Sequence, residues 1–130
     1  MWFDPKPPSW TNEYRIAVAN YTTALNPILP HGWLGSWGLW QETMGFLGRS
    51  YRTYALDFWG FGESGKKRET YAVQDFVGLV NQFMEQLGIS QAPLVGHSMG
   101  GTVSLALAIQ HPQRVRKAVV VGSPIVGSSL

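Results

Sequence analysis

The sequence predicts an α/β fold with a mainly parallel sheet and helices on both faces of that sheet. The second half of the chain alternates strand and helix, which is the order that connects parallel strands. Two apolar runs without alternation, at 92–95 and 118–121, are typical of strands buried on both faces. In the segment 73–87, apolar residues recur at helical spacing, as expected of a helix that packs against a sheet.

The elements of the first part of the chain are short. Residues 1–13 are rich in Pro and Trp and show no periodicity, so we expect an arm that lies over the surface. Residues 14–19 alternate large apolar with small or polar residues, which predicts a half-buried strand. Residues 25–29 form a short apolar segment that leads into His31 and Gly32.

The middle and the end of the chain carry stronger patterns. Residues 39–47 favour a short helix closed by a glycine, and residues 51–56 favour a strand. The next helix ends at a capping glycine, Gly88, and its apolar face consists of Val73, Phe76, Val80, Phe83 and Leu87. Residues 99–110 predict a further helix, which ends just before Pro112.

Length and composition limit the class of protein. The 130 residues suffice for one domain with its own core, and we place that domain at 14–130. The net charge of +2 is too small to indicate a nucleic-acid partner. The absence of Cys excludes disulfides and thiol catalysis. We find no targeting signal and no apolar stretch of membrane-spanning length, so we expect a cytoplasmic protein without a membrane span.

The most informative motif is Gly96-His97-Ser98-Met99-Gly100, which joins a predicted strand to a predicted helix. A serine hydroxyl becomes a useful nucleophile when a sharp strand-to-helix turn exposes it near a base and oxyanion donors. Such a turn strains the backbone at Ser98, and side chains at Gly96 and Gly100 would collide with the neighbouring turn. Because a helix N-terminus directs N–H groups at the site, we assign the Met99 N–H as one oxyanion donor.

Together with two further motifs, this segment resembles the α/β-hydrolase fold superfamily, in the branch that uses a serine nucleophile. His31-Gly32-Trp33 is similar to the family's oxyanion loop, and the segment from Asp57 to Ser64 is similar to its DxxGxGxS loop. The resemblance covers residues 14–125, and the three motifs occur in the family's order. It therefore implies an incomplete α/β-hydrolase fold.

The resemblance also implies roles for individual residues. Ser98 would be the nucleophile, and the Trp33 N–H would be the second oxyanion donor. Supporting roles fall to His31, Gly32, Asp57, Gly96, His97 and Gly100. Dehalogenases and epoxide hydrolases of the superfamily carry Asp where this chain has Ser98, so acyl transfer to water is favoured. The implied partner is a small-molecule acyl or ester substrate, and neither a cofactor nor a metal is implied.

The base and the acid that such a serine requires are missing from the sequence. The family presents them in the order Ser, then Asp or Glu, then His. No Asp or Glu follows Ser98, and the last carboxylate of the chain is that of Glu85. The only later histidine, His111, would lie about 18 Å away along the predicted helix. A general base must approach to within about 3 Å, so His111 cannot serve.

The two other histidines and Asp57 are interpreted as structural. His97 adjoins Ser98 in the sequence, so its side chain should diverge from that of the serine. His31 belongs to the segment that supports the oxyanion loop in the family. Asp57 is interpreted as a carboxylate that fixes a loop rather than as the acid of a triad.

We therefore expect the N-terminal part of an α/β-hydrolase domain, without the C-terminal strands, lid, acid and base. Such a chain would be inactive as given, and its last strand would be an exposed apolar edge. The alternative is a non-catalytic remnant of the fold that acts as a binding module. The resemblance implies a central strand before His31, and Pro27 and Pro30 would remove hydrogen-bond donors from it, so this strand should be either shorter than usual or altered in its local sequence.

A second glycine pattern is weaker. Gly60 to Gly65 spells GxGxxG after a predicted strand, as in dinucleotide-binding loops. The segment that follows, 66–69, is a poor helix start, and the acid expected after the next strand is missing. We therefore expect no nucleotide cofactor.

Overall fold

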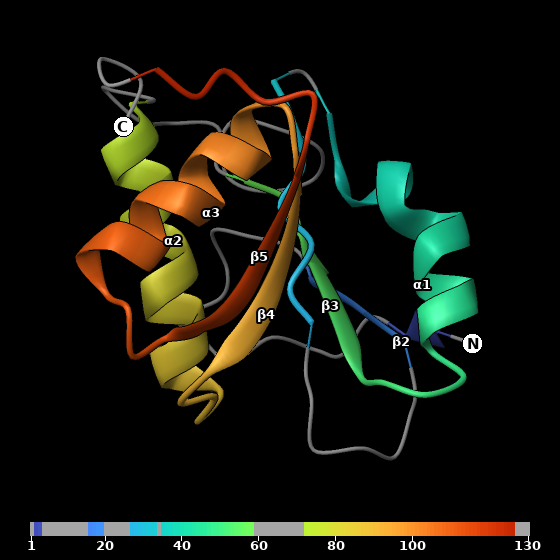
Figure 1. Ribbon diagram of the computed structural model, residues 1–130. Coiled ribbons are helices and arrows are strands. Elements are labelled where there is room, and N and C mark those ends of the chain that lie inside the picture. The colour runs from blue at the N-terminus through green and yellow to red at the C-terminus, as the bar shows by residue number, and fades with distance from the viewer. Residues whose placement is uncertain (1, 4–15, 20–26, 34, 59–71, 127–130) are drawn as a thin grey trace.

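The structure is a computed structural model, which describes residues 2–3, 16–19, 27–33, 35–58 and 72–126. Its strands form two groups (Figure 1). The first group is antiparallel and consists of β1 (Trp2–Phe3), β2 (Ile16–Ala19) and β3 (Thr53–Leu56). The second is the parallel pair of β4 (Ala92–His97) and β5 (Val115–Val121).

Ile28 joins these two groups. It forms one parallel bridge with Tyr54 of β3 and another with Leu94 of β4. Its N–H donates to the Pro93 carbonyl over 3.0 Å, and its carbonyl accepts from the Val95 N–H over 2.9 Å. Parallel pairing therefore continues from β3 through Ile28 to β5, while the strands on the other side of β3 are antiparallel.

Within the described residues 27–33, the strand pairing consists of isolated bridges at Ile28 rather than a regular ladder. Pro27 and Pro30 have no N–H, but both of their carbonyls accept hydrogen bonds. The Pro27 carbonyl accepts from Tyr54 N–H over 2.9 Å, and that of Pro30 accepts from His97 N–H over 3.2 Å. The chain is thus held by both neighbouring strands up to the residue before His31.

Helices cover both faces of the sheet, as the sequence predicted (Figure 1). α1 (Gln41–Leu47) continues the 3₁₀ turn η2 (Trp37–Trp40) on one face. α2 (Val73–Gln86) and α3 (Met99–Gln110) lie together on the other face. Within the described part of the chain, none of the helices has the length and apolar character that a membrane span requires.

Two clusters of buried side chains fill the space between the helices and the sheet. The larger cluster lies under α2 and α3, and the smaller one lies under α1 and consists of Leu29, Trp40, Met44 and Ala55. Of the predicted α2 face, Phe76, Val80 and Phe83 are fully buried. Leu87 was wrongly placed on that face, because the helix has already ended there and its side chain is 39% exposed.

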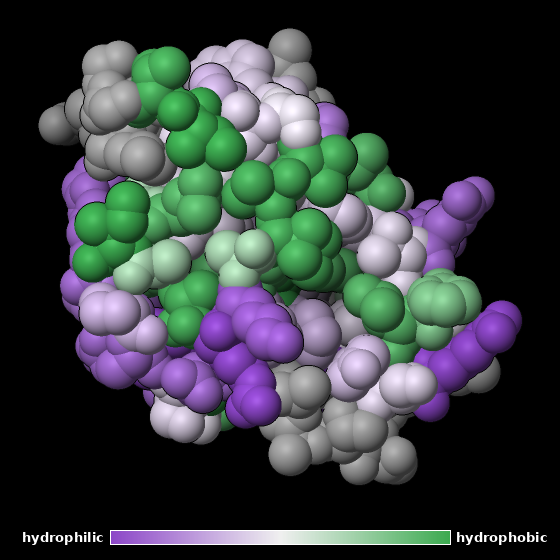
Figure 2. Space-filling model, viewed as in Figure 1, coloured by the Kyte–Doolittle hydropathy of each residue, from purple (hydrophilic) through white to green (hydrophobic). Residues whose placement is uncertain are grey.

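The apolar strands are less buried than their sequence pattern predicts. Val119 and Val121 of β5 are 53% and 49% exposed, so the prediction that 118–121 is buried on both faces is wrong. They pair with Val95 and His97 and share the sheet face of α1, which packs over β2 and β3 and leaves β5 uncovered. Figure 2 shows hydrophobic surface around the upper part of β5. Among the described strands β5 pairs with β4 alone, so within this part of the chain the expected exposed apolar edge is present.

The first residues of the expected arm form an edge strand instead. Trp2 pairs with Ala19, and Phe3 pairs with Val18. The rest of the arm, at 4–13, lies outside the described residues, as does the glycine-rich loop at 59–65.

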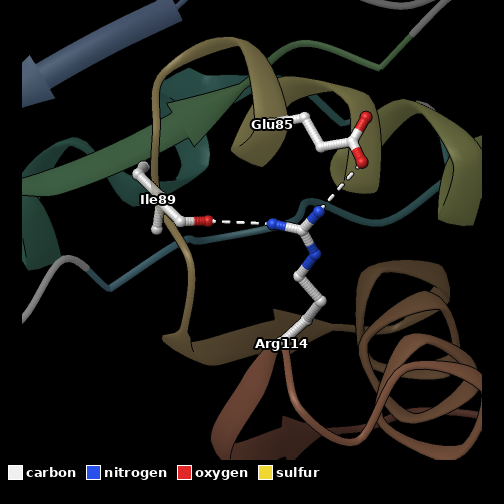
Figure 3. A network of polar contacts seen from close by, with 3 residues as sticks. All are labelled: Glu85, Ile89 and Arg114. Carbon is white, nitrogen blue, oxygen red and sulfur yellow. Dashed lines mark hydrogen bonds and ion pairs between the residues drawn. The ribbon is translucent and has the colours of Figure 1, made fainter.

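Arg114 lies at the N-terminal ends of β4 and β5 and connects them to the segment after α2 (Figure 3). Its Nη1 donates to the Ile89 carbonyl over 3.2 Å, and its Nη2 pairs with Glu85 Oε1 over 3.0 Å. The carbonyl of Arg114 accepts from the Ala92 N–H over 2.9 Å. One residue therefore links the end of α2, the following loop and the start of the parallel pair.

We expect Arg114→Ala to lower the free energy of unfolding by about 1–2 kcal/mol, because the Ile89 carbonyl loses a charged donor. Glu85→Ala should cost about 0–1 kcal/mol, because the Glu85 side chain is 59% exposed and its ion pair is screened by water. Urea unfolding followed by tryptophan fluorescence measures both. A larger loss for Glu85→Ala would contradict this order.

Candidate active site

Ser98 lies at the turn between β4 and α3 in a strained backbone conformation. Its φ is 52° and its ψ is −121°, and among the described non-glycine residues no other has a positive φ. Such conformations cost about 1–3 kcal/mol and persist only when the surroundings impose them. Here the Ser98 N–H donates to the Val121 carbonyl and the Ser98 carbonyl accepts from the Gly101 N–H, each over 2.9 Å. The predicted strain at Ser98 is confirmed.

Two glycines allow this turn to form. A Cβ on Gly96 would press against the Gly100 carbonyl, so the predicted collision with the neighbouring turn is confirmed for Gly96. A Cβ on Gly100 would instead press against the Pro30 carbonyl and lie 2.6 Å from that of His31. The obstacle at Gly100 is therefore another segment of the chain, which corrects the prediction for this residue.

Gly32 brings the segment after His31 against the turn. A Cβ on Gly32 would lie 2.9 Å from the Ser98 Cβ and 3.2 Å from Nδ1 of His97. The structure thus brings the His31-Gly32-Trp33 motif against the Gly96-to-Gly100 motif, although the two are far apart in the chain. Trp33 follows directly, and its side chain is 57% exposed.

Met99 is the first residue of α3. No helix carbonyl lies one turn before it, so the helix itself provides no acceptor for its N–H. This N–H therefore lies at the helix terminus, next to Ser98. The assignment of the Trp33 and Met99 N–H groups as oxyanion donors stays a prediction.

His31 is fully buried, and both of its ring nitrogens are hydrogen-bonded. The Phe58 N–H donates to Nε2 over 2.9 Å, so Nε2 carries a lone pair. Nδ1 therefore carries the proton and donates to the Gly32 carbonyl over 2.7 Å. Burial lowers the pKa of His31, and the hydrogen bond to Gly32 and the charge of Asp57 oppose this shift. Neither nitrogen is available as a base for Ser98.

Asp57 is also fully buried. Its Oδ1 accepts from the backbone N–H of Trp37 over 2.7 Å, and Trp37 is the first residue of η2. The carboxylate thus fixes the turn that precedes α1 against the end of β3. This geometry agrees with its interpretation as a loop-fixing carboxylate.

The two other histidines lie at opposite ends of α3. The His97 ring is partly buried, and its Nδ1 has no hydrogen-bond partner among the described residues. His111 caps the far end of α3, a helix of 12 residues and therefore about 18 Å long. Within the described ranges, no group of three or more His, Asp or Glu residues could hold a metal ion.

The sequence analysis did not predict that the segment after β5 contacts the first turn of α3. The Thr102 Oγ1 donates to the Pro124 carbonyl over 2.8 Å, and a Cβ on Gly101 would collide with the Ser123 side chain. The segment is thereby held against the first turn of α3. The second glycine of the Gly100-Gly101 pair was the one signal of this close approach.

Residues 28–129 match the alpha/beta hydrolase fold family, and the chain belongs to this family. It is 42% identical over 89 residues to the 2-hydroxymuconate semialdehyde hydrolase of Pseudomonas sp. strain CF600, which is 68% of this chain and 31% of that protein. It is 40% identical over 94 residues to the uncharacterized hydrolase YugF of Bacillus subtilis, which is 72% of this chain and 34% of the relative.

Solved structures share the fold of this chain. The crystal structure of a membrane phospholipase A superposes with a TM-score of 0.82 at 25% identity, over 97% of this chain and 40% of that one. Naproxen esterase from Bacillus subtilis shares the fold with a TM-score of 0.79, over 91% of this chain and 42% of the esterase. The chain thus spans about a third of the length of its curated relatives.

We expect Gly100→Ala to lower the free energy of unfolding by about 1–3 kcal/mol, because the new methyl group meets the backbone at 30–31. Gly78→Ala is the matched control, since it lies within α2 with no atom near the added Cβ. This control should raise stability by about 0.5–1 kcal/mol. Urea unfolding of both variants tests the close approach, which equal effects would contradict.

The buried His31 predicts a loss of stability in mild acid. Its folded pKa lies below its ordinary value of 6.5, so the unfolded chain takes up the proton first as the pH falls. Between those two pKa values the free energy of unfolding should fall by up to about 1.4 kcal/mol per pH unit. Urea unfolding at several pH values, together with an NMR titration of His31, measures this. A His31 titration at or above 6.5 would contradict it.

Proposed function

We propose that the protein is a serine hydrolase that acts on a small molecule with an ester-like or related carbonyl group. The observation that carries this proposal is the strained backbone of Ser98, with the Gly32 segment packed against it. A structure that retains such strain at a serine points to a use for that serine. Membership of the alpha/beta hydrolase fold family supports the same class of reaction.

In the proposed reaction, Ser98 Oγ attacks the carbonyl carbon of the substrate and gives up its proton to a general base. The carbonyl oxygen becomes an oxyanion, which the N–H groups of Trp33 and Met99 stabilise. The leaving group departs with a proton, and an acyl-enzyme ester remains on Ser98. Water then attacks this ester and releases the acid, which restores the serine.

We propose that the general base and its acid come from residues that the present sequence does not contain. After Ser98 the chain offers no carboxylate and one histidine, which lies at the other end of α3. The curated relatives are about three times as long as their match to this chain, which supports a base and an acid outside these 130 residues. On its own, the 130-residue chain is expected to bind substrate weakly and not to turn it over.

The substrate class rests on the nucleophile and on the relatives. The name of the Pseudomonas relative specifies hydrolysis of a semialdehyde, and other relatives are named as acyltransferases or epoxide hydrolases. A serine nucleophile favours the acyl chemistry among these reactions. An ester, or a carbonyl compound cleaved at a neighbouring bond, is therefore the proposed substrate.

Fluorophosphonate labelling of the protein in its native source tests this proposal. We expect a labelled species clearly heavier than 14.4 kDa, with the label on the peptide that contains Ser98. Ser98→Ala should abolish the labelling, whereas the control Ser90→Ala, at an exposed position after α2, should retain it. An unlabelled native protein with a mass of 14.4 kDa would favour a non-catalytic remnant instead.

A further inference from the structure

The peptide that joins Gly32 to Trp33 contains the N–H that we predict to be an oxyanion donor. Its carbonyl oxygen accepts a hydrogen bond from Nδ1 of His31 over 2.7 Å. The peptide is trans, so its C=O and its N–H point in opposite directions. The bond to His31 therefore holds the carbonyl on one side and turns the N–H of Trp33 away from that ring.

His97, the last residue of β4, approaches Gly32 from another direction. A Cβ on Gly32 would lie 3.2 Å from Nδ1 of His97 and 2.9 Å from the Ser98 Cβ. The hydrogen atom that glycine carries in place of this Cβ therefore points toward both residues. The His97 N–H also donates to the Pro30 carbonyl over 3.2 Å, so ring and backbone of His97 both meet the segment 30–32.

The Nδ1 atom of His97 is shielded from solvent and has no hydrogen-bond partner among the described residues. A neutral imidazole carries one proton, on either Nδ1 or Nε2. On Nδ1 this proton would be a buried donor without an acceptor, whereas a lone pair there lies beside the C–H group of Gly32. The proton of the neutral His97 ring therefore belongs on Nε2.

The two histidines beside Gly32 thus carry their protons on different nitrogens. His31 is protonated on Nδ1, because its Nε2 accepts from the Phe58 N–H. In each ring, the state of Nδ1 suits the group of Gly32 that it meets. The N–H of His31 meets the carbonyl oxygen, and the lone pair of His97 meets a hydrogen on Cα.

We infer that His97 is a positioning residue, which together with His31 keeps the Trp33 N–H directed at the oxyanion of the proposed reaction. This role rests on the proposed function of Ser98. Gly32 has no side chain of its own to limit its rotation, so the two rings restrain it from two directions. The inference uses packed contacts between 30–32 and 97–98 and no exposed surface.

NMR of the complete native protein with isotope-labelled histidine tests the two tautomers at about pH 8, where an ordinary histidine is neutral. We expect the Nε2–H tautomer for His97 and the Nδ1–H tautomer for His31, and His97→Gln identifies the His97 signal. This measurement needs no activity and is made on the unaltered protein. A neutral His97 ring with its proton on Nδ1 would overturn the inference.

The rate at which a fluorophosphonate labels Ser98 in the complete protein tests the positioning role. We expect His97→Ala to lower the maximal labelling rate about tenfold and to change the half-saturating reagent concentration less than about twofold. The reason is that the Trp33 N–H stabilises charge that develops in the transition state. His97→Asn should keep the rate within about threefold, because its side-chain oxygen can replace the lone pair of Nδ1.

His111→Ala is the matched control, because His111 lies at the far end of α3, and its rate should equal that of the unaltered protein. Circular dichroism verifies that each variant is folded. An unchanged rate in folded His97→Ala, or an equal loss in His97→Asn, would overturn the inference and leave the proposed function intact. Labelling that persists in Ser98→Ala would instead contradict the proposed function, and this inference with it.

Discussion

The close approach of two backbone segments is the constraint on which the candidate site depends. The segment 30–32 passes so near the first turn of α3 that a methyl group on Gly100 would meet the carbonyls of Pro30 and His31. The same approach places Gly32 against Ser98. Glycine is needed on both sides of the contact, because any side chain would separate the segments. The distance between Ser98 and the predicted oxyanion loop is thus set by backbone packing.

The sheet and two buried polar residues hold these segments in place. Pairing on both sides of Ile28 fixes the chain just before the contact. The carbonyls of Pro27 and Pro30 accept hydrogen bonds from the neighbouring strands, although neither proline has an N–H to donate. Beyond the contact, His31 joins Gly32 to Phe58, and Asp57 joins the end of β3 to Trp37. Polar groups buried at such a position stabilise the loops only while each keeps its partner.

Local patterns predicted the elements, while contacts between distant segments decided the rest. The sequence indicated α2, α3 and the strain at Ser98, because periodicity and the glycine motif act over short stretches. It overestimated the burial of β5, since burial depends on which elements cover a strand rather than on its own residues. The collision that constrains Gly100 depends on a partner from another segment. So does the β-bulge in β5, where Arg116 and Lys117 both lie opposite Pro93 of β4. No local pattern specifies such partners.

The hydrogen bond from the Ser98 N–H to the Val121 carbonyl has a consequence for synthesis of the chain on the ribosome. Chains emerge with the N-terminus first, and domains fold as units once enough of them is available. Ser98 is made before Val121, so the turn cannot be closed by this bond until β5 has left the ribosome and paired with β4. Until then the serine is free to relax into an ordinary conformation. The strained turn is therefore among the later features of this chain to become fixed.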